Sequence, residues 1–294
     1  MQDFTLKKNE LENALYIVAT PIGNLGDITL RALDVLRDVD VIVCEDGRVT
    51  ASLLKRYNIE GKQTFSYNDH SGEKVRKKIL EFLMLKKSVA LVSDAGTPLI
   101  SDPGYKLINF LRKFNQKVIP LPGASALTTA ICASGLASDS FLFVGFLPNT
   151  KVQKENFLTG LPRNFTFVFF ESSNRMSVTL ETLHKVVGNR NVCVARELTK
   201  LHEEIISDEL EVVIKHFTDN ASNLRGEFVV VVEKAQKGDH AFTQEDIKQE
   251  IANSIKMGHS LKDLSKNLSE IYDMNKRDIY QLALAQEKPE IDEK

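Results

Sequence analysis

The amino-acid sequence predicts an α/β protein with two α/β lobes, followed by a small helical module. Three observations lead to this fold class. Short apolar runs rich in β-branched residues alternate with helical patterns as far as residue 235, which is typical of α/β domains. Most of these runs end in polar or glycine-containing loops. After residue 240 the pattern changes to three short amphipathic helices.

Length and composition narrow the class of protein. The 294 residues suffice for two domains with their own cores, and 43% hydrophobic residues are ordinary for a soluble globular chain. A formal net charge of -2 does not indicate a nucleic-acid binder, so such binding would need a local basic patch. No apolar run approaches the roughly 20 residues of a membrane span, and the N-terminus lacks the apolar core of a secretory signal. We therefore expect a cytoplasmic protein without a membrane partner.

The cysteines and histidines indicate neither a disulfide framework nor a metal site. Cys44, Cys132 and Cys193 lie far apart, and two of them fall in strand-like runs, which predicts reduced, buried thiols. The 6 histidines are scattered, and no pair of cysteines or histidines has the spacing of zinc ligands.

The first lobe, residues 14–123, follows the pattern of a parallel, doubly wound sheet. Apolar and β-branched residues predict strands over residues 15–22, 39–43, 89–92 and 117–121. Helical spacing predicts helices over residues 29–38, 49–57, 72–87, 106–114 and 128–134. The strands run into the loops PIGN, CEDGR, SDAGTP and PGASA. A parallel sheet gathers such loops along one edge, where we expect the ligand site.

The loop that follows the strand at residues 89–92 is the centre of this expected site. Gly96 can adopt a positive φ and let a ligand approach the backbone. Asp94 can accept hydrogen bonds from a ligand hydroxyl or ammonium. The alternative is a tight turn stiffened by Pro98 and Pro103, and this loop by itself favours neither interpretation.

The second lobe, residues 124–236, has a similar alternation. Strands are expected over residues 140–146, 165–170, 192–195, 203–206 and 227–233, and helices over residues 151–158, 176–187 and 208–217. The boundary between the lobes is expected near residues 122–138. A crevice between two lobes is a common place for a ligand.

The ends of the chain differ from the lobes. Residues 1–13 are expected to form a flexible arm and residues 287–294 a disordered tail. Residues 240–286 predict three helices, with Thr243, Ser260 and Asn275 as caps. This module is either a helix-turn-helix-like appendage or a helical lid. Its acidic residues outnumber its basic ones, which weakens a role in nucleic-acid contact.

Common catalytic motifs are absent from the sequence. It contains no GxGxxG after the first strand, no GxxxxGK[ST] and no GxSxG. The remaining candidates are charged residues at predicted strand ends: Glu45, Asp46, Arg48, Asp94, Glu171, Arg175, Arg196, Glu197 and Lys200. Any one of these residues is more often a solvated loop charge or a helix cap than a catalyst. Their clustering at strand ends favours a functional site but does not identify the reaction.

Seven stretches taken together resemble one enzyme family. They are VATPIGNLGDITLRAL, CEDGRVT, SDAGTPLISDPG, LPGASA, FESSNR, ARELTK and RGEF, in this order between residues 15 and 235. They are similar to the tetrapyrrole-methylase-like S-adenosylmethionine-dependent methyltransferases, and within them to the ribosomal RNA small subunit methyltransferase I subfamily. The opening TPIGNLGD is the discriminating stretch, because members acting on corrins or sirohaem have a different glycine-rich pattern there.

The resemblance implies a fold, a reaction and a set of partners. The fold is the non-Rossmann tetrapyrrole methylase fold, with S-adenosylmethionine bound in the cleft between the lobes and no metal. The reaction is methylation of the ribose 2′-hydroxyl of a cytidine in the decoding region of small-subunit (16S) ribosomal RNA. The implied partners are that RNA or the small ribosomal subunit, and a second copy of the chain in a homodimer.

The resemblance also implies site residues. Those expected at the cofactor are Pro21, Asp94, Ala95, Gly96, Ile100, Ser125, Ala126, Phe170, Leu198 and Gly226. Those expected to be catalytic are Glu45, Asp46, Arg48, Glu171, Arg175, Glu197 and Lys200. For Glu171 and Arg175, a structural ion pair one helical turn apart is an equal alternative.

One position departs from the subfamily, and other functions remain open. The subfamily usually has Thr where this chain has Gly47, which removes a hydroxyl and loosens the loop. The alternatives are a methyltransferase acting on a small tetrapyrrole, a non-catalytic RNA-binding scaffold, and a hydrolase that binds phosphate in the SDAGTP loop.

Overall fold

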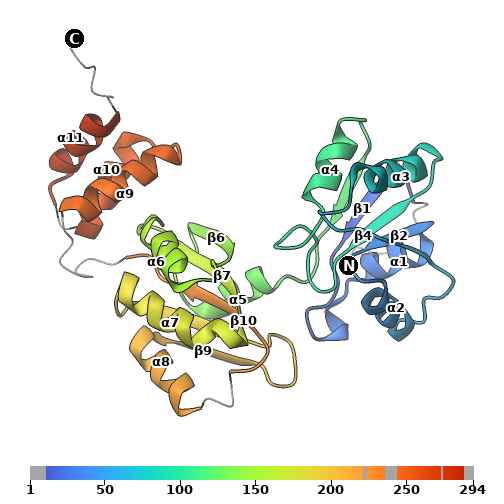
Figure 1. Cartoon of the computed structure of the whole chain (residues 1–294), viewed down its shortest axis with the longest axis horizontal. Coiled ribbons are helices and arrows are strands. Elements are labelled where there is room, and N and C mark those ends of the chain that lie inside the picture. The colour runs from blue at the N-terminus through green and yellow to red at the C-terminus, as the bar shows by residue number, and fades with distance from the viewer. Residues whose placement is uncertain (1–10, 221–223, 236–243, 273, 288–294) are drawn as a thin grey trace, which may run out of the picture. The chain divides into compact units, whose positions relative to one another are not determined.

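The computed structural model describes residues 11–220, 224–235, 244–272 and 274–287. It divides into two compact units, Met1–Ala126 and Leu127–Lys294, each with its own five-stranded sheet (Figure 1). Residues 1–10 of the expected arm and residues 288–294 of the expected tail lie outside the described residues. The domain boundaries drawn from the sequence stay predictions.

The sheet of the first unit is entirely parallel, with strand order β3-β2-β4-β1-β5. Its strands are β1 (Leu15–Val18), β2 (Val41–Cys44), β3 (Gln63–Ser66), β4 (Val89–Val92) and β5 (Val118–Leu121). The sequence missed β3. This strand is a mostly exposed edge with the sequence QTFS, so it lacks the apolar run that identifies a buried strand.

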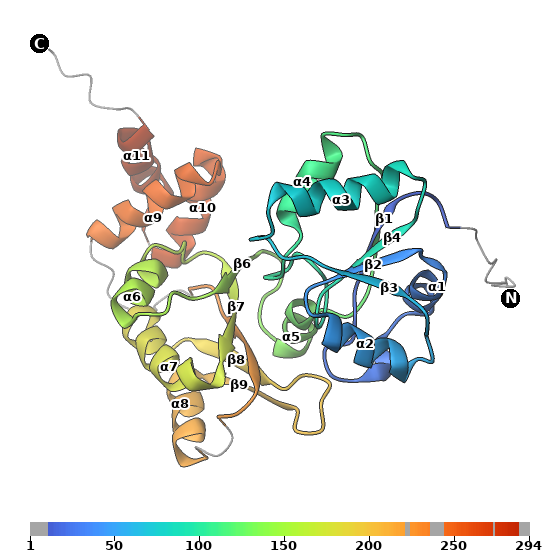
Figure 2. The ribbon, with the colours of Figure 1, turned by 45° about the vertical axis from the view of Figure 1, so that its right-hand side comes forward.

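Helices cover both faces of this sheet, as the doubly wound arrangement requires (Figure 2). Strands β2 and β4 are buried on both sides, and alternate residues enter different cores. Ile42 and Ala90 pack with α1 (Leu30–Asp38) and α2 (Gly47–Arg56). Val43 and Leu91 pack with α3 (Glu73–Met84) and α4 (Tyr105–Arg112). The strand ends are therefore held from both sides.

The sheet of the second unit is mixed, with order β6-β7-β10-β8-β9. Its strands are β6 (Phe141–Phe146), β7 (Thr166–Ser172), β8 (Asn191–Arg196), β9 (Glu204–Glu209) and β10 (Glu227–Val232). Only β6 and β7 pair in parallel, and the other three pairs are antiparallel. The parallel arrangement expected from alternation thus applies to the first unit. A short loop without a crossover helix joins β8 to β9, which favours antiparallel pairing.

Helices α7 (Ser173–Val187) and α8 (Leu210–Asp219) lie side by side on one face of this sheet (Figures 1 and 2). Their buried leucines and Phe217 pack on Phe169 and Val230. The remaining helices of the α/β part are α5 (Ala126–Ser134) and α6 (Lys151–Thr159). Cys44 and Cys193 are buried as expected, but Cys132 is exposed on α5, which corrects the prediction of three buried thiols.

The C-terminal module consists of α9 (Gln244–Lys256), α10 (Leu261–Tyr272) and α11 (Lys276–Glu287), which confirms the three predicted helices. Ser260 and Asn275 accept hydrogen bonds from first-turn N–H groups, as predicted for caps, whereas Thr243 lies outside the described residues. Ile251 and Leu268 belong to a separate core. None of the helices in the described ranges is long and apolar enough to cross a membrane.

Candidate functional site

The loops after β1, β4 and β5 are tied to one another at the carboxyl edge of the first sheet. Thr20 and Gly96 exchange two backbone hydrogen bonds, of 2.9 and 3.0 Å. The hydroxyl of Thr97 donates to the carbonyl of Ala124 at 2.9 Å. These bonds join the three loops into one surface. They involve backbone groups of distant segments, so the sequence alone does not predict them.

Two glycines allow this close approach. Gly96 has a φ of +79°, and a Cβ there would lie 3.3 Å from Cγ2 of Ile22. A Cβ on Gly123 would lie 2.6 Å from the Cβ of Ala19. Leu99 and Ser101 adopt φ values of 75° and 64°, a left-handed conformation that L-residues seldom take and that is often found at functional sites.

The loop after β2 joins the same surface through Asp94. Its carboxylate accepts a hydrogen bond from the N–H of Asp46 at 3.1 Å. Asp46 in turn caps α2 by accepting from the N–H of Arg48, and the Arg48 side chain donates two further bonds to it. These bonds lower the pKa of Asp46 to about 2. Asp46 is therefore a fixed anion near neutral pH, and catalytic roles for Asp46 and Arg48 stay predictions.

The edge of the first sheet is acidic. Desolvation and the charges of Asp94 and Asp102 raise the pKa of Glu45. Burial, and to a lesser extent Asp94, raises the pKa of Asp102, although a hydrogen bond from Ser93 opposes this. Asp102 was not among the predicted site residues, and its signal was its place in the SDAGTPLISDPG loop. Within the described residues, no group of side chains is arranged to hold a metal ion.

The predicted cofactor residues of the first unit all lie on these tied loops. Pro21 and Gly96 are buried, and Asp94 and Ala95 are exposed. Ile100, Ser125 and Ala126 are half-buried. The structure thus brings the strand-end loops together as parallel strands require, and contact of these residues with a cofactor stays a prediction.

The predicted residues of the second unit gather at one edge of its sheet. Phe228 of β10 lies opposite Glu171 of β7 on one side and Arg196 of β8 on the other. Phe170, Leu198 and the other predicted residues of this unit flank these positions in the chain. Tertiary pairing has therefore joined segments that lie far apart in the sequence.

Glu171 forms a buried ion-pair network. Its side chain is 0% exposed and lies 2.9 Å from Nε of Arg175 and 3.6 Å from Nζ of Lys154, which is 1% exposed. The hydroxyl of Thr179 donates to the same carboxylate at 2.7 Å. Arg175 also donates to the carbonyl of Leu147. These contacts favour the structural alternative, and a catalytic role for Glu171 and Arg175 stays a prediction.

A second network surrounds Glu197. Its carboxylate accepts from Nζ of Lys200 at 2.9 Å and from the N–H of Glu227 at 3.0 Å. Burial would lower the pKa of Lys200, but the carboxylates of Glu197 and Glu227 outweigh it and raise that pKa. Lys200 therefore stays protonated near neutral pH, which makes it a cation and unsuited to accept a proton. Gly226, expected at the cofactor, lies directly under the Glu197 side chain.

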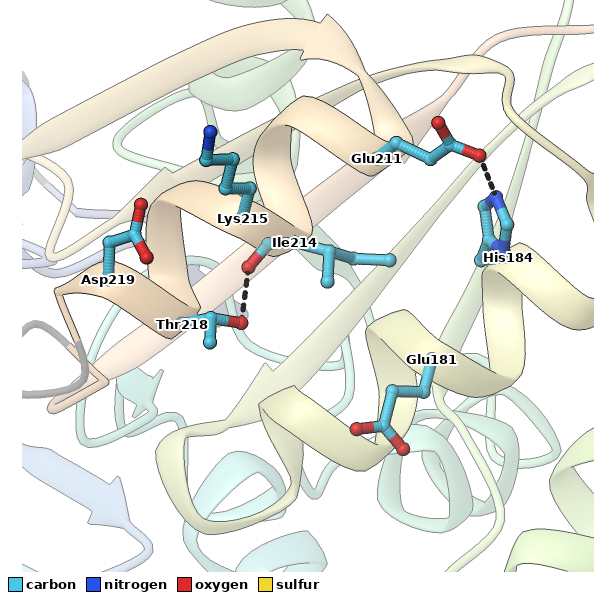
Figure 3. A pocket seen from close by; sticks show the side chains of 7 residues that line it. All are labelled: Glu181, His184, Glu211, Ile214, Lys215, Thr218 and Asp219. Carbon is cyan, nitrogen blue, oxygen red and sulfur yellow. Dashed lines mark hydrogen bonds and ion pairs between the residues drawn. The ribbon is translucent and has the colours of Figure 1, made fainter.

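A pocket of about 420 Å³ lies between α7 and α8 (Figure 3). Glu211 and His184 on its rim approach to 3.0 Å, and Lys215 and Asp219 also line it. None of the predicted site residues is among its lining residues. It belongs to the helical layer, apart from the strand ends.

Comparison with known proteins gives three findings. Residues 14–213 match the family model described as Tetrapyrrole (Corrin/Porphyrin) Methylases. A Synechocystis protein named "Ribosomal RNA small subunit methyltransferase I" is 40% identical over 273 residues, covering 92% of this chain and 97% of that protein. A Vibrio cholerae protein of the same name is 48% identical over 220 residues, covering 74% of this chain and 76% of that protein.

A solved structure has the same fold. The chain is similar to the uroporphyrin-III C-methyl transferase of Thermus thermophilus complexed with S-adenyl homocysteine, with a TM-score of 0.51 and 17% identity. The match covers 75% of this chain and 97% of that one. At this identity the likeness concerns the fold alone, and it confirms the predicted class of two α/β lobes.

Proposed function

The chain belongs to the tetrapyrrole (corrin/porphyrin) methylase family, and on that premise we propose that it methylates small-subunit ribosomal RNA. The donor is S-adenosylmethionine, and the acceptor is the 2′-hydroxyl of a cytidine in the decoding region. The names of relatives at 40% and 48% identity support the RNA substrate. Binding of this donor is supported by one observation, the cluster of carboxylates on the tied loops of the first sheet.

The chemistry of this cluster fits a cationic donor. S-adenosylmethionine carries a positive sulfonium and an ammonium, whereas the product S-adenosylhomocysteine has lost the sulfonium charge. One carboxylate oxygen of Asp94 accepts from the Asp46 N–H, and its other oxygen can accept from a ligand. The charges of Asp94, Glu45 and Asp102 favour the charged donor over the neutral thioether, which helps product release. The cofactor's place in a cleft stays a prediction.

The transfer itself needs mainly alignment. The bond from the ribose 2′-oxygen to the methyl carbon forms as the bond from that carbon to sulfur breaks, and the hydroxyl proton leaves to a base. Holding oxygen, carbon and sulfur in line supplies most of the rate gain, because the sulfonium already activates the methyl group. The loops joined by the Thr20–Gly96 and Thr97–Ala124 bonds provide the rigidity that such alignment needs.

Glu45 is the best proton acceptor among the predicted catalytic residues. Its raised pKa brings its basicity closer to neutral pH, where a general base is most effective. The pKa of Asp46 is too low for that task, and Lys200 is protonated. We further propose that Lys200 and Arg48 act as cations toward the RNA. We also propose that the protein acts in the cytoplasm, because small ribosomal subunits form there. The resemblance to the subfamily further suggests a homodimer.

Transfer of a labelled methyl group tests this function. The full chain would be incubated with S-adenosylmethionine and small ribosomal subunits from cells that lack the modification, and the RNA would be digested to nucleosides. Label in 2′-O-methylcytidine is the expected result, and subunits that already carry the methyl group are the control. Label in another nucleoside would refute the cytidine assignment.

Two alternatives give different outcomes in the same assay. A methyltransferase of small tetrapyrroles would bind the donor, leave the RNA unlabelled and label a tetrapyrrole acceptor. A non-catalytic scaffold would bind RNA without binding the donor. The relatives named for ribosomal RNA favour the RNA substrate over both.

A further inference from the structure

The C-terminal module contains a cationic pocket outside the proposed active site. The pocket has a volume of about 460 Å³ and lies between α10 and the start of α11. Its lining residues are Lys262, Asn275, Lys276, Arg277 and Tyr280. The three cations are exposed, and none has an ion-pair partner within the part of the chain that the structure describes. Three positive charges thus line one hollow, and none is held in an ion pair with another described side chain.

The local fold fixes these side chains on one surface. Tyr280 follows Arg277 by three residues and Lys276 by four, so it lies on the side of α11 next to each of these cations. Leu264 of α10 and Ile279 of α11 are buried in the same core, which packs the two helices together. This packing holds the cation of one helix near those of the other.

The start of α11 adds to the positive character of the pocket, and two acids lie near it. The N–H of Arg277 donates to the Asn275 side chain at 2.9 Å, which marks the start of α11. The N-terminal end of a helix carries a partial positive charge. The carboxylate of the nearby Asp263 accepts a hydrogen bond of 2.6 Å from the Ser260 hydroxyl, so one of its oxygens is already hydrogen-bonded. Asp278, in the first turn of α11, is a further acid at this helix end.

We propose that this pocket binds the phosphate backbone of the RNA substrate, with a base stacked on Tyr280. Lysine and arginine on phosphates combined with an aromatic ring under a base are the usual means of holding single-stranded RNA. This inference rests on the proposed function and names where the RNA is held. The acidic edge of the first sheet would repel phosphates, and the chain has a net charge of -2. A separate cationic surface is therefore needed to hold a polyanion.

The module is joined by hydrogen bonds to the α/β part of its own unit, so binding there can hold RNA close to that part. Glu250 of α9 accepts a hydrogen bond from the N–H of Arg163 at 2.5 Å. Asn253 of the same helix donates to the carbonyl of Gly160 at 2.7 Å. The rings of His259 and Phe165 lie 5.1 Å apart.

The test compares two triple variants of the full chain. One is Lys262→Gln, Lys276→Gln and Arg277→Gln. The matched control is Lys55→Gln, Arg56→Gln and Lys113→Gln, which removes three exposed cations of the first unit. Binding to a labelled fragment of small-subunit RNA would be measured from 50 to 300 mM salt. Each phosphate contact contributes about 0.7 to the slope of log affinity against log salt for a single strand.

We expect the pocket variant to bind the RNA at least about tenfold more weakly at low salt, with a slope smaller by about 2. The control should keep the wild-type slope. Tyr280→Leu should weaken binding by about tenfold without changing the slope, because stacking releases no counterions. Binding of S-adenosylhomocysteine should be unchanged in all three variants, which verifies that they are folded.

The outcomes separate this inference from the proposed function. If wild-type protein methylates the RNA and the pocket variant binds it with wild-type affinity and slope, the pocket proposal is wrong and the function stands. An equal loss in both triple variants would also overturn the pocket proposal, since it would reflect net charge alone. If wild-type protein neither binds nor methylates the RNA, both proposals fail.

Discussion

The side chain of Glu197 occupies the space in which a side chain at Gly226 would have to lie. A Cβ on Gly226 would be 2.3 Å from Oε1 and 2.5 Å from Cγ of Glu197. The same Glu197 carboxylate holds the N–H of Glu227 and the ammonium of Lys200. The glycine of the RGEF stretch is thus required by a contact inside the protein, whatever ligand the site takes.

Substituting Gly226 should therefore destabilise the second unit. Gly226→Ala adds the cost of a left-handed φ of +91°, and it displaces Glu197 from its hydrogen bonds. We expect a loss of about 3 kcal/mol in the free energy of unfolding, measured by urea denaturation. Gly135→Ala is the control, because its φ is +71° and nothing lies within 4 Å of its Cβ. It should lose only about 1 kcal/mol, and equal losses in the two variants would exclude the steric explanation.

The charge of Asp94 should distinguish donor from product. Asp94→Asn keeps an oxygen that can accept from the Asp46 N–H but removes the negative charge. We expect the affinity for S-adenosylmethionine to fall about tenfold and that for S-adenosylhomocysteine to fall less, measured by calorimetry. Asp34→Asn on α1, whose partner is Arg37, is the control and should leave both affinities unchanged. An equal loss for both ligands would contradict a role of the charge.

Removing the charge of Glu171 should show whether its role is structural. Glu171→Gln leaves the buried Lys154 and the half-buried Arg175 without their carboxylate. We expect a loss of about 3–5 kcal/mol in the free energy of unfolding. Adding Lys154→Met should recover part of it, because one uncompensated charge is then gone. A stable Glu171→Gln variant with impaired methyl transfer would instead support the catalytic prediction.

Attachment of the helical module should weaken as the pH rises. Burial raises the pKa of Glu250 from 4.5 to about 7, although hydrogen bonds from the Arg163 and Asn164 backbone and the charges of Arg163 and Arg190 oppose the shift. Between these two pKa values the folded state binds more protons than the unfolded state, so stability falls with rising pH. Over the whole window the loss is about 3 kcal/mol.

Hydrogen exchange of α9 at pH 5 and pH 8 measures this effect. Protection in the wild type, after correction for intrinsic exchange rates, should be lower at pH 8. Glu250→Gln should remove most of the difference, because the amide stays neutral and its oxygen can still accept from Arg163. An unchanged pH dependence would rule out Glu250 as its source.

Replacing Gly47 with threonine should be tolerated. No heavy atom lies within 4 Å of a Cβ built on Gly47, and its φ is not positive. Gly47 is the first residue of α2, where glycine is a poor helix former. Gly47→Thr should change the free energy of unfolding by between 0 and about +0.5 kcal/mol and retain methyl transfer. A loss above about 1 kcal/mol would mean that the loop needs glycine.

The sequence determined four of the five strands of the first sheet, the loops that follow them and the family. Strands β2 and β4 are continuous apolar runs because both of their faces are buried, and such runs are visible in the sequence. The seven ordered stretches identified the family correctly. Strand β3 was not predicted, because an exposed edge strand does not require an apolar pattern.

Only the tertiary structure decided how the charged residues are used. Glu171 and Glu197 looked alike as carboxylates after apolar strands. Glu171 is buried in an ion-pair network, whereas Glu197 lies over Gly226 and pairs with Lys200. Antiparallel pairing of β10 with β7 and β8 brought these segments to one edge. Local patterns depend on which residues are buried, so the sequence determined the strands and their loops. Contacts between segments remote in the chain decide which distant strands pair and which single charges are buried. Only the tertiary structure therefore shows these features.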